Sequence, residues 1–354
     1  MKLHYFHSPH GNFGDDLNGW LWPELLPGLW DEGEDDITFV GVGTILNRLI
    51  PPSRVKIVFG SGVGYSPLPA GLDDGSWQFL AVRGPLSARA AGLPPEKVIT
   101  DGAILLAEVD GLTKPLDQRT GGVVFIPHVS STETGAWEAI CERLGITYID
   151  PRWDFHDVFR LIGNARLALT EAMHGAIVAD TLRVPFVPLV TSREISSFKW
   201  MDWALSMDIP YRPIRLPHSS LLDSARDRMV ASMGHGHLHR AVFDQTPDAA
   251  ETLADEMLHQ LARSAEHESS ALGQFVSRNS KRAWRRLVKP AASKASGGLL
   301  KSLDRRLLDT CTEAVRRAMQ APSFLSDDRV FADRRGRMVE KLAAVRQLAG
   351  RVDA

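Results

Sequence analysis

The sequence contains few of the features that mark secreted or membrane-spanning proteins. Its 354 residues include only two cysteines, Cys141 and Cys311, which stand in no spacing typical of a zinc or redox site. A disulfide-stapled secreted domain is therefore not expected, and a reducing compartment fits better. No apolar run approaches the roughly 20 residues that cross a bilayer, and residues 1–5 lack the apolar core of a signal peptide. These absences predict a cytoplasmic protein, soluble or at most peripheral on the inner face of the cytoplasmic membrane.

Charge is unevenly distributed along the chain, although the formal net charge is only −2. Residues 270–306 contain ten Lys and Arg and a single acid, so this segment carries +9 and the remainder −11. The basic residues alternate with apolar ones, namely Phe275, Val276, Trp284, Leu287 and Val288. This pattern predicts contact with an anionic membrane surface, with a solvated helix or an oligomer contact as the alternative. Nucleic acid is not an expected partner, because the rest of the chain is acidic and has no recognition motif.

Short apolar strands that end in glycine alternate with helical patterns in the first part of the chain. Ile37–Val42 and Val55–Phe59 are β-branched and apolar, and each runs into a glycine-rich turn. Phe79–Val82 is followed by the helical pattern of Leu86–Ala91. Strands of this kind separated by helices are typical of a parallel doubly wound sheet, in which ligands bind at the carboxyl ends of the strands.

The same organisation begins again after a polar linker at 114–122, and it ends near residue 263. We therefore predict an α/β protein with two Rossmann-like domains, 1–113 and 123–263, which face each other across a cleft in a GT-B-like arrangement. Residues 264–354 are expected to form an appended basic helical tail, with helices at 299–319 and 324–349. A truncation near residue 265 should then preserve turnover, and the tail helices offer a contact for homo-oligomerisation.

Three strand-to-helix junctions carry the candidate chemical groups. The first is Asn12-Phe13-Gly14-Asp15-Asp16, where glycine allows close approach of a ligand and the acids stand at a helix start. A simple helix cap is one interpretation. The other is that Asn12 and Gly14 bind substrate, while Asp15 or Asp16 faces the cleft as a general base.

The second junction is Arg83-Gly84-Pro85-Leu86-Ser87, which places an arginine beside a helix N-terminus. Such an arginine can hold an anion with Ser87 nearby, or it can form an ordinary ion pair. Asp101, in Thr100-Asp101-Gly102, repeats the pattern with an acid that binds substrate or orients its neighbours.

The third junction is Thr170-Glu171-Ala172-Met173-His174-Gly175. It places an imidazole where a strand ends and a helix begins, with backbone amides available for phosphate. We predict that His174 is catalytic, and that Glu171 and Gly175 contribute to substrate binding.

These junctions, in this order, resemble the polysaccharide pyruvyl transferase family over roughly residues 1–215. The resemblance implies a phosphoenolpyruvate donor and no further cofactor. It also implies a lipid-linked oligosaccharide or polysaccharide acceptor, from which a pyruvate ketal forms and phosphate is released. By the same resemblance, His174 is a general acid or phosphate ligand, Arg83 an anion clamp and Asp15 or Asp16 the base near the acceptor.

The chain departs from the family pattern at one position. Many members carry an arginine two residues before the histidine, where this sequence has Ala172. Arg193 and Lys199 are candidates to replace that cation. His235, His237 and His239 alternate along the chain, but the glycines between them favour a flexible loop, so no metal site is predicted.

Two other functions are consistent with the same patterns. A GT-B glycosyltransferase that uses a nucleotide sugar would have the same two domains and the same glycines at the strand ends. A non-catalytic scaffold would use the basic tail to hold partners at a membrane. The thermal shift caused by each donor distinguishes the first alternative, and the effect of changing His174 distinguishes the second.

Overall fold

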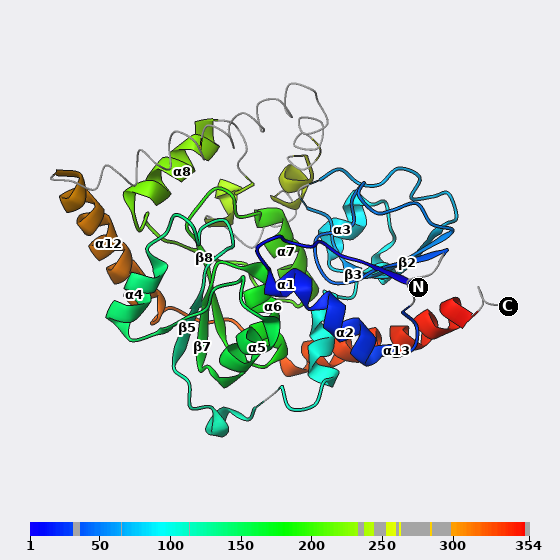
Figure 1. Cartoon of the computed structure of the whole chain (residues 1–354). Helices are drawn as coiled ribbons and strands as arrows, with labels where there is room; N and C mark the ends of the chain where they lie inside the picture. Colours follow the sequence, from blue (N-terminus) through cyan, green and yellow to red (C-terminus); the bar gives the residue numbers. More distant parts are fainter. Residues whose placement is uncertain are drawn as a thin grey trace.

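The computed structural model describes residues 1–30, 36–64, 66–112, 114–232, 237–243, 253–259, 262, 284 and 299–350. Figure 1 shows two groups of parallel strands, each with helices packed against it. The mixed α/β class with parallel sheets is therefore confirmed. Within the described residues, no helix combines the length and apolar character needed to cross a membrane.

The first sheet is four-stranded and entirely parallel, in the order β1-β2-β3-β4. Its strands are β1 (Lys2–His4), β2 (Ile37–Val40), β3 (Val55–Ser61) and β4 (Trp77–Val82). All four residues of β2 are buried, as expected for a parallel strand that is covered on both faces. The short helices α1 (Phe13–Asp16) and α2 (Asn18–Leu25) follow β1, and α3 (Pro85–Ala90) follows β4.

The second sheet is five-stranded and parallel, in the order β6-β5-β7-β8-β9. Its strands are β5 (Val123–Ile126), β6 (Thr147–Tyr148), β7 (Leu167–Thr170), β8 (Phe186–Val190) and β9 (Ile214–Arg215). The helices that belong to this part are α4 (Trp137–Leu144), α5 (Phe155–Asn164), α6 (Met173–Thr181), α7 (Ser197–Ser206) and α8 (Leu221–Ser232). The strand order reverses between β5 and β7. Sheets of this type bind ligands at the carboxyl ends of the strands beside such a reversal.

The two sheets are joined by packed elements and not only by a linker. The 3-10 helix η2 (Gly102–Glu108) packs against α6, α1 packs against α5, and α3 packs against α7. Buried residues of both sheets belong to one hydrophobic cluster. The carboxyl ends of β1–β4 are therefore held close to those of β5 and β7.

The C-terminal helices differ from the appended tail that the sequence suggested. The helix α12 (Leu299–Ala318) packs on α4 and α8, while α13 (Asp328–Gly350) packs on η2 and β4. Buried side chains on both helices complete the two cores: Cys311, Val315, Ala318, Phe331, Met338, Leu342, Val345 and Ala349. The two helices lie at opposite ends of the molecule, and α13 (red) runs beside α2 (Figure 1), where Arg346 donates to the Leu25 carbonyl at 2.9 Å.

The chain between these helices is also fixed to the second sheet. Phe324 exchanges two backbone hydrogen bonds with Phe186, at 2.9 and 2.7 Å. Ser326 donates through its amide and hydroxyl groups to the buried carboxylate of Asp180, at 2.7 and 2.8 Å. Because these contacts are internal, residues 299–350 are part of the folded body.

One apolar residue of the basic segment, Trp284, lies among the described residues and is not available for contact with lipid. Trp284 is only 5% exposed and packs under the guanidinium of Arg226, so it does not present its ring to a membrane. The other apolar residues of the predicted lipid-binding pattern lie outside the described residues. The two cysteines are both free and buried.

Candidate active site

Glycine-rich turns at the carboxyl ends of β2 and β3 form one wall of the candidate site. Gly43 has φ +118°, and a Cβ added there would lie 3.3 Å from Asp15 Oδ1. A Cβ at Gly64 would overlap Thr44 and lie 3.3 Å from Lys199 Cδ. The absence of side chains at these two positions therefore allows Asp15 and Lys199 to approach the ends of the strands.

In the turn after β1, the side chains of Asp15 and Asp16 point in different directions and have different partners. Asp16 accepts a hydrogen bond from the Asn12 amide at 2.8 Å and so closes the first turn of α1. Asp15 is held by the Asn12 side chain and points toward Gly43. Burial raises the pKa of Asp15 to about 7; the charge of Asp16 adds to this, and that of Lys199 opposes it. Of the two predicted bases, Asp15 is the one that faces the other ionisable groups.

His174 occupies the first turn of α6, directly after β7, and its ring packs on the backbone of Gly14. A Cβ at Gly14 would overlap the ring, so this glycine allows the histidine to lie beside Asp15. Its Nε2 is buried and has no hydrogen-bond partner among the residues that the structure describes. Burial and the charges of Lys199 and Arg83 lower the His174 pKa to about 3, so the imidazole is neutral.

Two of the predicted binding residues shape this junction from within. A Cβ at Gly175 would overlap the Thr170 hydroxyl, so Gly175 allows α6 to pack closely on the end of β7. Glu171 is fully buried and accepts hydrogen bonds from the His128 and Thr191 amides at 3.0 and 2.9 Å, and from the Ser131 and Thr191 hydroxyls. Its carboxylate therefore ties together the loops that follow β5, β7 and β8.

Arg83 forms a fully buried ion pair whose partner the sequence did not identify. Its Nε donates to Asp202 at 3.0 Å, and both side chains have no exposed surface. The two remaining nitrogens donate to the Thr44 hydroxyl and the Val63 carbonyl, each at 2.8 Å. The ion pair, which was one of the two sequence interpretations of Arg83, is thus present in the structure.

Ser87 belongs to the same internal network. Its amide donates to Asp202 Oδ1 at 2.8 Å, its hydroxyl donates to Asp202, and the hydroxyl accepts from the Val63 amide at 2.9 Å. The structure therefore uses Ser87 to anchor α7 to the first sheet. A single acid among the aromatic residues of helix 197–206 was the signal that could have indicated this partner.

Lys199 lies one turn before Asp202 on α7, and its charge interacts with groups from both sheets. Burial and the charge of Arg83 lower the Lys199 pKa to about 8, while Asp15 and Asp101 oppose that shift. Asp101 caps η2 by accepting from the Ala103 amide at 3.0 Å, and its other oxygen is buried with no partner in the described part of the chain. Burial raises the Asp101 pKa to about 6.

Arg193, the other candidate cation, is committed elsewhere. Its amide donates to Asp227 at 3.0 Å, and its Nε lies 3.4 Å from the same carboxylate on α8. The ionisable groups Asp15, Arg83, Asp101, His174 and Lys199 interact with one another and form the cluster of the candidate site. His128 is a further member, which the sequence did not suggest. Burial and the charges of Lys199 and His237 lower its pKa to about 3.

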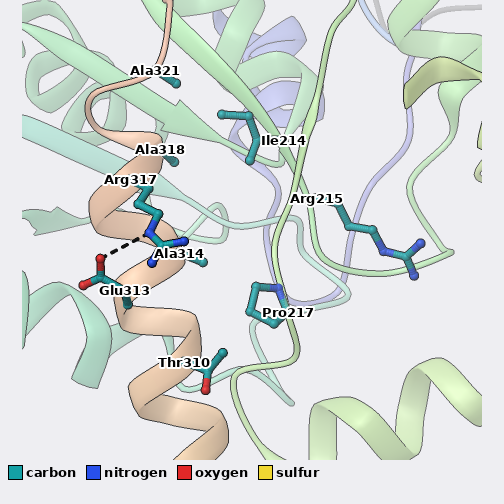
Figure 2. Close-up of a pocket in the computed structure, with 9 residues that line it drawn as sticks. All are labelled: Ile214, Arg215, Pro217, Thr310, Glu313, Ala314, Arg317, Ala318 and Ala321. Carbon is teal, nitrogen blue, oxygen red and sulfur yellow. Dashed lines mark hydrogen bonds and ion pairs between the residues drawn. The ribbon is translucent and has the colours of Figure 1, made fainter. Parts of the chain in front are cut away.

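Within the described residues, no group of three His, Cys, Asp or Glu side chains could hold a metal ion. Of the alternating histidines, His235 lies outside the described residues, and His239 is 3.3 Å from Glu256. The structure also has an open groove between β9 and α12, which none of the residues of the cluster lines. Figure 2 shows its walls, with the Glu313–Arg317 pair on α12 across from Ile214 and Pro217.

Comparison with known proteins shows the family of the chain. Residues 7–193 match the family model described as "Polysaccharide pyruvyl transferase". The chain belongs to this family. It is also 48% identical over 224 residues to "Succinoglycan biosynthesis protein ExoV" of Rhizobium meliloti (strain 1021), covering 62% of this chain and 69% of that protein. No solved structure matches the chain.

Membership in the polysaccharide pyruvyl transferase family identifies the protein as a transferase. The residues Asp15, Arg83, Asp101 and His174 lie inside the matched part. Lys199 and Asp202 follow it, so the two charged residues of α7 are contributed by a segment beyond the family match.

Proposed function

We propose that this protein transfers the enolpyruvyl unit of phosphoenolpyruvate to sugar hydroxyls of an exopolysaccharide precursor, where it forms a pyruvate ketal. The observation that carries the proposal is the buried cluster in which His174 Nε2 and Asp101 Oδ2 have no partner within the described residues. Buried polar atoms of this kind are rare unless a ligand satisfies them. Family membership supports the pyruvyl group as the unit transferred.

The donor carries a phosphate and a carboxylate, so its site requires fixed positive charge and hydrogen-bond donors. In this proposal Lys199 supplies the cation that the family arginine would supply at Ala172. His174 Nε2 donates to a phosphate oxygen. Arg83 contributes positive charge from behind the cluster, since Asp202, Thr44 and Val63 already accept from its guanidinium.

The relative and the architecture support a proposal for the acceptor and for the setting. The name of the 48% identical relative refers to succinoglycan biosynthesis, which favours an exopolysaccharide precursor on a lipid carrier as the acceptor. We further propose that the two parallel sheets form a GT-B-like cleft on the cytoplasmic side of the membrane. The first turns of α12 are exposed and offer Lys301, Arg305 and Arg306 to an anionic surface. Homo-oligomerisation through the C-terminal helices stays a prediction.

The donor is tested by thermal unfolding of the purified protein with candidate ligands. Phosphoenolpyruvate at 100 times its dissociation constant should stabilise the protein by about 2.7 kcal/mol. A nucleotide diphosphate should leave the melting temperature unchanged. Stabilisation by the nucleotide and not by phosphoenolpyruvate would favour a nucleotide-sugar glycosyltransferase instead.

The reaction is tested by phosphate release from phosphoenolpyruvate in the presence of lipid-linked oligosaccharides. His174→Ala removes a hydrogen bond to a charged group, which is worth about 1.5–3 kcal/mol, or about 10–150-fold in kcat/KM. The exposed His156 on α5 provides the matched control, and His156→Ala should behave as wild type. Equal rates in the two variants would remove His174 from the site and support a non-catalytic role for the protein.

A further inference from the structure

Lys199 interacts with the charges of Arg83, Asp15 and Asp101, although it lies outside the part of the chain that matches the family model. Its aliphatic chain lies against Gly64 in the turn after β3, and its ammonium group interacts with Asp15 and Asp101. Asp15 lies on the neighbouring turn, against Gly43. The lysine from α7 and the aspartate from α1 thus approach the same pair of strand ends.

Formation of a ketal from phosphoenolpyruvate requires a proton on carbon. The methylene group must become a methyl group, so an acid near neutral pH must lie close to it. His174 is a poor candidate, because its depressed pKa keeps the imidazole neutral, and the single N–H of a neutral imidazole can donate a hydrogen bond but is too weak an acid to protonate carbon. Lys199 keeps its proton at neutral pH, and burial has made it more acidic than an exposed lysine.

Resting on the function proposed above, we propose that Lys199 is the proton donor to the methylene carbon of phosphoenolpyruvate and that Asp15 is the base for the sugar hydroxyl. In the first step the π electrons of the double bond take a proton from the Lys199 ammonium. This leaves a neutral amine and an oxocarbenium centre at the adjacent carbon. The first sugar hydroxyl attacks that centre and gives its proton to the Asp15 carboxylate.

The second half of the reaction restores both groups. The bond between the central carbon and the phosphate oxygen breaks, and phosphate leaves with the proton held by Asp15. The second hydroxyl attacks the renewed oxocarbenium centre and gives its proton to the Lys199 amine. The original Lys199 proton is then on the methyl group and has been replaced by the proton of the second hydroxyl, while the proton of the first hydroxyl is on the phosphate, so atoms and charges balance. The protein is ready for another cycle.

The surroundings of Lys199 suit this exchange, because groups of both signs face it from each sheet. Burial and the charge of Arg83 favour loss of the Lys199 proton, and the carboxylates of Asp15 and Asp101 favour its retention. The ionisable groups that interact with it are Asp15 on α1, Arg83 after β4, Asp101 before η2, His128 after β5 and His174 on α6. The lowering effects dominate and bring the Lys199 pKa to about 8, close enough to neutral pH for the amine both to give and to take up a proton.

Lys199→Arg tests the proposal, because it keeps a positive charge but holds its proton too tightly to release it. We expect donor affinity, measured by thermal shift, to stay within about fivefold of wild type. Turnover should fall at least 100-fold, within the usual contribution of a general acid. Lys97→Arg makes the same substitution at a lysine outside the cluster, so it is the matched control and should retain full turnover.

Two further measurements separate proton transfer from simple charge. Ethylamine should restore turnover to Lys199→Ala in proportion to its concentration. For wild type, kcat/KM should fall below about pH 7, where Asp15 is protonated, and above about pH 8, where Lys199 loses its proton. The alkaline fall should be absent in Lys199→Arg. Retention of more than a tenth of wild-type turnover by Lys199→Arg would overturn the proposal, as would a folded Lys199→Ala that no primary amine rescues. A wild-type protein that releases no phosphate with any acceptor would instead overturn the proposed function itself.

Discussion

Among the ion pairs of the described structure, the buried pair of Arg83 and Asp202 should cause the largest loss of stability when only one partner is replaced. Both side chains are fully buried, and Asp202 also accepts from the amide and hydroxyl of Ser87. Asp202→Asn would leave the guanidinium charge buried without a counter-charge. It would also face three donors with an amide that has only one acceptor oxygen.

The magnitude follows from the burial of the pair. Removing one partner of a buried pair costs about 3–5 kcal/mol, because the remaining charge is uncompensated. The helix α3 offers a matched control in Arg89, which pairs with Asp255 at a site where the two side chains are 47% and 51% exposed. Exposed pairs contribute about 0–1 kcal/mol. We therefore expect Asp202→Asn to lower the free energy of unfolding by at least about 2 kcal/mol more than Asp255→Asn, from the difference between these two ranges.

Urea unfolding of the two variants, followed by far-UV circular dichroism, measures this difference. A double variant, Arg83→Met with Asp202→Asn, should recover part of the loss, because the unpaired buried charge is gone. Equal destabilisation by Asp202→Asn and Asp255→Asn would refute the reasoning. So would a double variant no more stable than the sum of its single changes predicts, since the two charges would then not be coupled.

Three other changes test the remaining features. Gly14→Ala should reduce kcat/KM at least tenfold and also lower the stability, because the new Cβ would overlap His174 from its ring back to its Cβ; an unchanged kcat/KM would mean that the position of the ring is not needed. Asp101→Asn keeps the hydrogen bond that caps η2. Burial raises the pKa of Asp101 to about 6 in the folded protein, so its ionised form destabilises the fold at pH 8. Removing that charge should stabilise the ligand-free protein at pH 8 by up to about 3 kcal/mol. That gain, measured by urea unfolding, should shrink as the pH falls through 6 toward 4, because wild-type Asp101 then takes up its proton in the folded state; a gain independent of pH would contradict it. Truncation after residue 319 removes α13 and should abolish cooperative thermal unfolding, because it exposes the face of the first sheet that the helix covers; a stable and active truncated protein would show that α13 is dispensable.

The sequence alone indicated much of the local structure and named Asp15, Arg83, Asp101, His174 and Lys199, but not His128 or Asp202. Apolar runs that end in glycine indicated the parallel strands, because these patterns report burial on both faces and close turns at the carboxyl ends. In parallel sheets such ends gather at one edge, so the positions of Asp15, Arg83 and Asp101 along the chain group them at the first sheet, and His174 joins them only through the predicted cleft between the two domains. The order of the same motifs also identified the family, which the match over residues 7–193 confirms.

Tertiary structure decided which of these groups bind one another and which face the site. The partner of Arg83 lies 119 residues away on α7, and no local pattern specifies a pairing over that distance. Asp15 and Asp16 are adjacent in sequence, yet one turns toward Gly43 and the other back to Asn12. The basic composition of the C-terminal part suggested an appendage, whereas α12 packs on α4 and α8 and α13 packs on η2 and β4. These outcomes depend on long-range packing. The sequence of a helix indicates which of its faces is apolar, but it does not indicate which surface of the protein will cover that face.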